Sequence, residues 1–438
     1  MKKIAGVIGC IAIVLSITAC KWEIPEKISV KTDAEYNFAL GKFDKDLNEE
    51  MGISALLGAS NANDVNITRY DYFPGKEDKN VQHFLVEVKV LDHTLIPAEN
   101  VETAFGSAGS KTAAELSITS NIANQVGLDF SPIDILNGMS EAMGTDVVGK
   151  VSFANVPIYF YCEVTEGLSA NASFDMFYGS KENPVAERTG TRTNMYNAPI
   201  TSCAKPAYVF ENDTVIISDL EKKPYSAKID ITDIMNNRSD SIQENDQLCI
   251  YYLISSISGS VSKAAAQNGI KIAIYAAIDI PLQFTALEDI KMNLNDFAGS
   301  LDGAETPETP DTSAAKDSEF SKYLKVVEAI RIKYDTYKLP LYTAKKREMQ
   351  LGVDMIGKGN YDYAEIHTIK EGKDIPEEDR CHIDLRQSTI EKIKETGVFI
   401  PNFQLKIVKD ALFSVPRDKG VKVNLELSLK TDGTVAVK

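Results

Sequence analysis

IKIAIYAAIDIPLQF, residues 270–284, alternates apolar residues with a mixed set of polar and small ones. A period of two is typical of a β-strand with one buried and one solvated face. Fifteen extended residues span about 50 Å, whereas an ordinary strand has about 5–6 residues. The segment therefore predicts an unusually long strand with a continuous apolar face, made by Ile270, Ile272, Ile274, Ala276, Ile278, Ile280, Leu282 and Phe284.

Pro281 interrupts this segment near its end. Proline has no N–H to donate to a neighbouring strand, so it belongs at a sheet edge or a bulge. Two interpretations remain open. One long strand bends at Pro281, which suits a curled sheet, or two ordinary strands meet there at a kink.

The same alternation recurs along the chain and predicts a mainly β protein. It is found at residues 28–40, 84–90, 156–164, 168–178, 248–254 and 421–429. Asp432-Gly433 after the last segment predicts a tight turn, and the apolar residues that follow predict a hairpin. Elongated antiparallel sheets are expected, packed as a β-sandwich or curled around an apolar groove.

Helical patterns are a minority. Ser131 followed by Pro132 predicts an N-cap and a first helical residue for a helix over 132–144. Ser388 and Glu391 form a capping-box pattern before a helix that ends at Gly397. Two further helices are predicted at residues 44–58 and 112–127.

The length of 438 residues is sufficient for two or three domains. Residues 300–319 are acidic and rich in Thr, Pro and Ala, a composition that cannot bury enough apolar surface to order itself. This segment is either a linker between a β-rich domain at 28–299 and a second one at 320–438, or a long disordered loop. A weaker division is possible at residues 179–194.

The charge balance excludes some partners. The 63 acidic and 47 basic residues give a net charge of −16. Nucleic-acid binding needs clustered Lys and Arg, and so does a polybasic contact with anionic lipid. We therefore expect no nucleic acid among the partners.

The amino-terminal residues have the anatomy of a secretory signal peptide. Lys2 and Lys3 precede an uncharged apolar run at residues 4–17, and small residues follow it. The run is shorter than the 18 or more residues of a spanning helix. Residues 1–19 are therefore predicted to be a signal that is removed.

The end of this signal, Ile17-Thr18-Ala19-Cys20, resembles the lipobox of bacterial lipoproteins. It is similar to the relaxed form found in spirochaetes, with Ile17 where the common motif has Leu. The resemblance covers the first twenty residues only. It implies that Cys20 is lipidated and becomes the first mature residue, which anchors the protein to a membrane of the cell envelope.

The anchor constrains where the protein lies. Residues 20–27 are predicted to be a short tether, which keeps the body close to the bilayer. Lys21 follows Cys20, whereas an Asp there favours the inner membrane in Gram-negative sorting. The outer membrane is therefore expected, with the exposed leaflet undetermined.

Four cysteines remain in the mature chain: Cys162, Cys203, Cys249 and Cys381. An exported protein permits disulfides, and four cysteines allow three pairings, among which the spacing does not choose. Because Cys162 and Cys249 fall in apolar strand patterns, buried free thiols are the alternative. No CxxC motif supports a zinc or redox site.

No motif in the chain predicts catalysis, a cofactor or a metal site. Ser260 and Lys263 match the SxxK pattern of serine acyl-enzymes, but the companion SDN and KTG motifs are absent. Cys381 and His382 are neighbours and would point to opposite faces of a strand. A non-enzymatic lipoprotein is therefore expected. It either binds or carries an apolar ligand such as lipid on the face from Ile270 to Phe284, or serves as a structural or adhesin-like interaction protein of the envelope.

Overall fold

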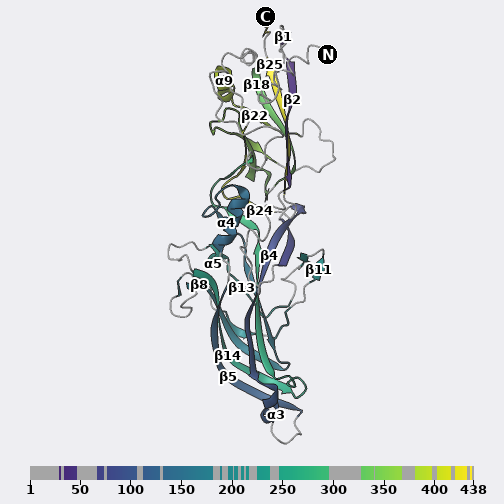
Figure 1. Ribbon diagram of the computed structural model, residues 1–438, viewed down its shortest axis with the longest axis vertical. Coiled ribbons are helices and arrows are strands. Elements are labelled where there is room, and N and C mark those ends of the chain that lie inside the picture. The colour runs from purple at the N-terminus through teal and green to yellow at the C-terminus, as the bar shows by residue number, and fades with distance from the viewer. Residues whose placement is uncertain are drawn as a thin grey trace.

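The computed structural model describes a mainly β protein in which every strand pairing is antiparallel. The described residues are 29–30, 34–46, 67–73, 76–105, 112–128, 132–180, 188–189, 196–200, 202–205, 209–211, 214–216, 224–236, 246–294, 327–339, 341–366, 380–396, 402–415, 420–431 and 435–436. The described elements follow one long axis (Figure 1). The expected fold class is confirmed.

Two sheets form one end of the molecule, the lower end in Figure 1. The first has the order β10-β8-β14-β5, with β9 paired to β8. Its strands are β10 (Tyr196–Ile200), β8 (Leu168–Ser180), β14 (Asp246–Ser262), β5 (Ala113–Gly127) and β9 (Arg188–Thr189). The second, β13-β7-β15-β4-β3, consists of β13 (Ala227–Asp230), β7 (Pro157–Val164), β15 (Ile270–Pro281), β4 (Lys76–Ile96) and β3 (Ile67–Phe73).

These two sheets face each other as a β-sandwich. Phe160 of β7 stacks on Phe174 of β8, with ring centroids 4.1 Å apart. Alternate residues of β14, including Ile250 and Ile254, and alternate residues of β15 belong to one buried cluster. The connection from β4 to β5 crosses between the sheets through η1 (Ala98–Asn100) and α3 (Val101–Ala104).

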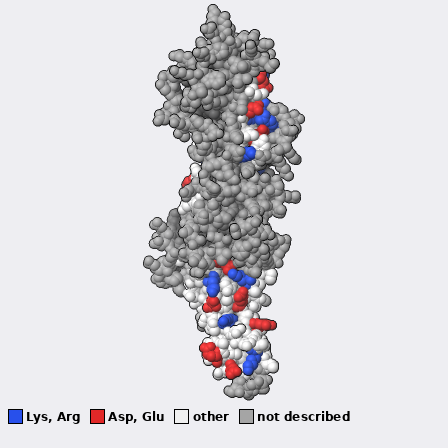
Figure 2. Space-filling view, turned by 45° about the vertical axis from the view of Figure 1, so that its right-hand side comes forward, with Lys and Arg blue, Asp and Glu red and all other residues white. Residues whose placement is uncertain are grey.

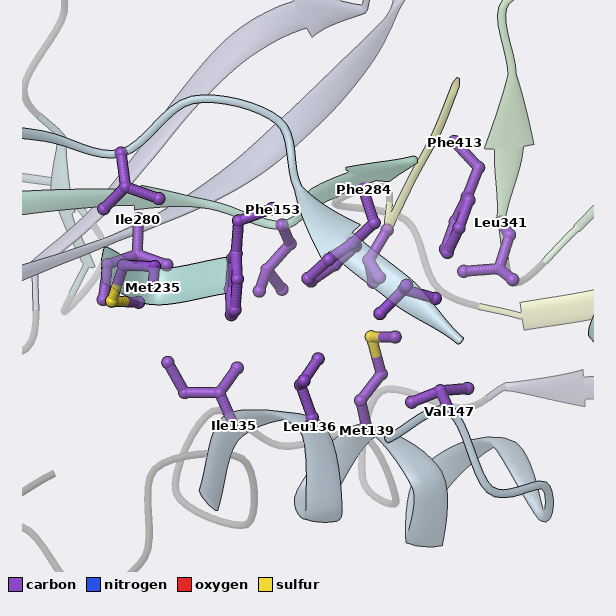
Figure 3. Close-up of a cluster of buried hydrophobic side chains, with 14 of the residues drawn as sticks. Ile135, Leu136, Met139, Val147, Phe153, Met235, Ile280, Phe284, Leu341 and Phe413 are labelled. Atoms are coloured by element: carbon purple, nitrogen blue, oxygen red, sulfur yellow. The ribbon is translucent and has the colours of Figure 1, made fainter. Parts of the chain in front are cut away.

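The middle of the molecule is a smaller four-stranded sheet covered by a helix. The sheet order is β19 (Tyr342–Thr343), β24 (Leu412–Ser414), β16 (Gln283–Ala286) and β6 (Val151–Phe153). Ile135, Leu136 and Met139 of helix α4 (Pro132–Met143) point toward Phe153 and Phe284 of this sheet (Figure 3). The short helix α5 (Thr232–Asn236) also packs beside β6.

Two further sheets lead to the opposite end. One has the order β17 (Ile290–Asn293), β23 (Asn402–Ile407), β20 (Met349–Asp354) and β21 (Asp362–Glu365), with η3 (Lys346–Glu348) before β20. The other has the order β2 (Ala34–Asp46), β25 (Gly420–Thr431), β18 (Val327–Lys338) and β22 (Cys381–Asp384), followed by helix α9 (Gln387–Thr396). Two short pairs complete the set: β1 (Ser29–Val30) with β26 (Val435–Ala436), and β11 (Val209–Glu211) with β12 (Thr214–Ile216).

The segment that predicted one long strand is two strands. Strand β15 ends at Pro281, and β16 begins at Gln283 in a different sheet. Pairing of β15 with β7 stops at Ile278, so Pro281 has only β4 beside it. Proline is tolerated there because no neighbour needs its missing N–H.

Two local predictions are wrong, and a third is contradicted over its first three residues only. Residues 112–127 were expected to be helical, but residues 113–127 form strand β5 because they pair with β14. Strand β26 pairs with β1 rather than forming a hairpin with β25, since β2 and β18 occupy both edges of β25. The predicted helix 44–58 begins inside strand β2, and its remaining residues lie outside the described ranges.

The helix starts are correct to within a few residues. Helix α4 begins at Pro132 and ends just before Gly144, which has a left-handed φ of 59°. Helix α9 begins at Gln387, so Ser388 lies within its first turn instead of capping it. Asp362 of β21 supplies the polar contact at this end, because it accepts a hydrogen bond from the Thr389 hydroxyl at 3.2 Å.

The predicted segments 1–19, 20–27 and 300–319 lie outside the described residues, and the division of the chain into domains stays a prediction. Four of the sheets combine strands from both sides of residues 300–319. For example, β16 pairs with β24, and β2 pairs with β25.

Candidate functional site

The predicted apolar face is fully buried. Ile270, Ile272, Ile274, Ile278, Ile280 and Phe284 are 0% exposed, and Leu282 is 1% exposed. From Ile270 to Ile280 the face packs inside the sandwich, and Phe284 packs between Phe153 and Phe413 at centroid distances of 5.2 and 5.6 Å. Side chains this inaccessible line neither an open groove nor a water-sized cavity.

The opposite face of the same sheet carries a buried polar cluster. His83 of β4 and Asp279 of β15 are 196 residues apart in sequence, and the Nδ1 atom of His83 lies 2.9 Å from Asp279 Oδ1. Tyr161 of β7 is completely buried nearby, in a small cluster with Leu85 and Tyr159. These side chains alternate with the apolar face, so the sheet is buried on both sides here.

A segment that crosses this face completes the cluster. Lys205 Nζ donates to Glu87 Oε1 at 2.6 Å, and the Lys205 backbone N–H donates to Glu163 at 3.0 Å. The Cys203 thiol donates to the Pro224 carbonyl, and its backbone N–H to the Cys162 carbonyl. Charge pairing and backbone hydrogen bonds therefore attach residues 202–205 to the sheet.

The surroundings of the cluster suppress ionisation of the Tyr161 phenol and the Cys203 thiol. Burial raises the pKa of the Tyr161 hydroxyl, and the neighbouring Cys203, Glu87 and Asp279 raise it further. Burial and then Glu163 raise the pKa of the Cys203 thiol. A thiol is a nucleophile only as the thiolate, so Cys203 is poorly suited to covalent catalysis.

Partly buried apolar side chains are concentrated on β4 and β5, one strand from each sheet of the sandwich. Among the described strands, β5 is the last in its sheet order and pairs with β14 alone. Among the described residues, fourteen hydrophobic side chains are partly buried against the main core, and nine of them are on these two strands. They are Val88, Leu91, Leu95, Ile96, Ala114, Leu116, Ile118, Ile122 and Val126.

The described surface at the lower end of the molecule in Figure 2 shows no large patch of one charge. Acidic and basic side chains are interspersed over the lower end of the molecule in Figure 2. The described His, Cys, Asp and Glu residues form no group of three or more that could hold a metal ion. Within the same ranges, no helix has the length and apolar character needed to cross a membrane.

The positions of the cysteines decide between disulfides and buried thiols, but they do not bear on the lipid anchor. Cys162, Cys203, Cys249 and Cys381 form no disulfide in the described part of the chain, and Cys162 and Cys249 are buried. Cys20, the predicted lipidation site, lies outside the described residues. No sequence motif predicts the pairing of His83 with Asp279, which depends on contacts between distant strands.

Comparisons with known proteins add little. No family model matches the chain, and the curated proteins contain no match. The chain is similar to the crystal structure of a "putative secreted protein" from Parabacteroides distasonis, at 10% identity and a TM-score of 0.36, covering 91% of this chain and 100% of that one. A structure of broad bean stain virus aligns at 10% identity and a TM-score of 0.18, over 76% of this chain and 95% of that one. Neither likeness is close enough to carry a functional argument.

Proposed function

We propose that this protein is a lipid-anchored component of the bacterial cell envelope with a structural or protein-interaction role. The burial of the face from Ile270 to Phe284 is the observation that carries the choice of role. A carrier of apolar ligands needs an accessible apolar surface or cavity, and this face offers none.

The anchor is supported by the sequence. Ile17-Thr18-Ala19-Cys20 closes an apolar run in the way that a lipobox does. Acyl chains on Cys20 would hold the protein firmly, since each buried methylene contributes about 0.8 kcal/mol. Lys21 in place of Asp supports the outer membrane as the destination.

Binding or carrying an apolar ligand such as lipid was the first function expected from the sequence, and it stays an untested prediction. Its proposed site was the face that is now seen to pack against other sheets. The structural role requires no such site, because a filled sandwich can present edges and loops to partners. The geometry therefore favours the second candidate.

A non-enzymatic role is part of the proposal. The buried polar cluster around His83 and Asp279 brings together a histidine and a carboxylate. Its nearby thiol and phenol, Cys203 and Tyr161, both have raised pKa values and are held protonated. These properties suit a cluster that stabilises residues 202–205 on the sheet.

Metabolic labelling with radioactive palmitate tests the anchor. The full chain should incorporate label, and the Cys20→Ser variant should not. Cys10→Ser is the matched control, because Cys10 lies within the predicted signal and should leave labelling unchanged. Continued incorporation in Cys20→Ser would contradict the anchor assignment.

Membrane fractionation of the same three proteins tests the location. The wild type and Cys10→Ser should float with outer-membrane vesicles, whereas Cys20→Ser should lose this association. Recovery of wild-type protein wholly in the cytosolic fraction would contradict an envelope role.

A further inference from the structure

Strand β5 differs from the other sheet edges of this protein. It has fifteen residues, no proline, a single charged residue, Glu115, and one register shift against β14. Sheet edges in natural proteins are usually protected by charge, proline, bulges or shortness. A long edge with so little protection is suited to pairing with another strand.

The other edges of the sandwich have this protection. Strand β10 is five residues long and contains Pro199, and β13 has four residues. Strand β3, the edge beyond β4, has seven residues, of which Arg69 and Asp71 are charged. The part of β4 beyond β3 has two register shifts against β15 and carries the Lys89–Asp92 ion pair at 3.0 Å. Among the described strands of the sandwich, the contrast singles out β5.

The apolar core is also incomplete along this edge. Leu116, Ile118, Ile122 and Val126 of β5 pack against the core but are only partly buried. Leu91 and Leu95 of β4, in the other sheet of the sandwich, are partly buried too. A strand added beside β5 would extend the sheet and cover this apolar row.

We propose that β5 is the interface through which two copies of this chain associate, with the two β5 strands antiparallel across a two-fold axis. The inference deepens the proposed structural role by naming the partner as a second copy. The pairing would join two four-stranded β10-β8-β14-β5 paths into one continuous sheet. An isologous contact of this kind closes on itself and gives a dimer.

The sequence of β5 is complementary to itself in this orientation. A register shift against β14 places an irregularity at residues 120 and 121, between two regular halves. In the register centred on Ser120, residues 113–118 of one copy lie opposite 127–122 of the other. Ile118 then faces the partner's Ile122, and Glu115 faces the partner's Gln125, so no like charges are opposed.

The charge of the chain also favours this edge for self-association. Each copy has a net charge of −16, so a contact between copies is opposed by general repulsion. The repulsion is smallest where the contact itself is nearly uncharged, as it is along β5. A basic partner would instead be expected to select an acidic edge.

Cysteine pairing tests the interface and its register. Ser117 and Ala123 are exposed on the same face of β5, and the proposed register places each opposite the other residue of the second copy. Opposed residues have Cα atoms about 4.5–5.5 Å apart, a distance that a disulfide can bridge. Within one copy the two residues are about 20 Å apart.

The full-length Ser117→Cys/Ala123→Cys variant should therefore give a covalent dimer on mild oxidation in the cell, seen by non-reducing electrophoresis. The matched controls are the two single variants, which lack an opposed cysteine and should remain at the wild-type background. The proposal would be overturned if the single and double variants cross-linked equally or if the double variant gave no dimer. A cross-link to a different protein would also overturn it.

A charge pair at the same two positions provides a second test that does not need oxidation. Ser117→Lys/Ala123→Lys opposes two pairs of like charges, whereas Ser117→Lys/Ala123→Glu opposes two pairs of unlike charges. By sedimentation in detergent, the first should dimerise about fivefold or more weakly than the second. Equal dimerisation by the two variants would contradict the interface.

Repeating the cross-link with Cys20→Ser added separates this inference from the anchor. Loss of palmitate labelling with the dimer retained would support both assignments. A Ser117→Cys/Ala123→Cys protein with Cys20 intact that fails to label but still cross-links would overturn the anchor alone.

Discussion

Phe160 and Phe174 stack face to face across the two sheets of the sandwich, with ring centroids 4.1 Å apart and planes inclined by 18°. Both rings are completely buried. Their contact lies between β7 and β8, the strands next to β15 and β14 in their sheets. The space where a curled sheet would hold a ligand is therefore occupied by the protein's own side chains.

Phe160→Ala should destabilise the protein by about 3–5 kcal/mol, because the change removes a buried ring and leaves a cavity. Denaturant unfolding followed by circular dichroism measures the loss. Leu287→Ala is the matched control, since Leu287 is 46% exposed and its truncation should change stability by less than about 0.5 kcal/mol. Similar losses in the two variants would argue against a tightly packed sandwich.

The stability of the protein should fall at alkaline pH, in part through Cys162. Burial, assisted by Glu163, raises the pKa of this thiol from its ordinary value of 9.0 to about 12. The unfolded state therefore ionises first, so the contribution of Cys162 is complete below pH 9 and is lost as pH rises toward 12.

The comparison of wild type with Cys162→Ala isolates this contribution. Between pH 9 and 12 the free energy of unfolding of the wild type should fall more steeply, by about 1.4 kcal/mol per pH unit. Denaturant titrations at several pH values measure both slopes. Parallel curves for the two proteins would show that the thiol titrates normally in the folded state.

Asp362 should stabilise the start of helix α9. Its carboxylate accepts hydrogen bonds from the Thr389 hydroxyl and from the Arg386 side chain. Asp362→Ala should cost about 2 kcal/mol, because it leaves the buried Thr389 hydroxyl without this acceptor. Thr389→Val, which removes one donor and keeps the shape, should cost less, and the opposite order would contradict this assignment.

The long alternating segments could be predicted as strands from the sequence, because only a period of two fits their apolar residues. Ile272, Ile274 and Ile278 follow a period of two that no helix accommodates, and all three are buried in β15. Strand β5 was misassigned because Ile118, Ile122 and Val126 are four residues apart. That spacing fits one face of a helix and one face of a strand equally well.

Pairing with β14 decides the conformation of β5, and local propensity contains no information about that neighbour. The same limit applies to the polar cluster. His83 and Asp279 meet only because β4 and β15 are adjacent, with Pro281 opposite His83. Contacts of this kind depend on sheet order, which a single sequence does not specify.

Lipid analysis of the purified protein tests the central claim, that the apolar faces are filled by the protein itself. The full chain is purified in detergent. Mass spectrometry of the intact protein measures the covalently attached acyl chains, and solvent extraction of the same sample measures the non-covalent lipid. We predict that only the acyl chains covalently attached at Cys20 are found in stoichiometric amounts. A stoichiometric free lipid that survives exhaustive detergent exchange would contradict the account and restore the carrier function.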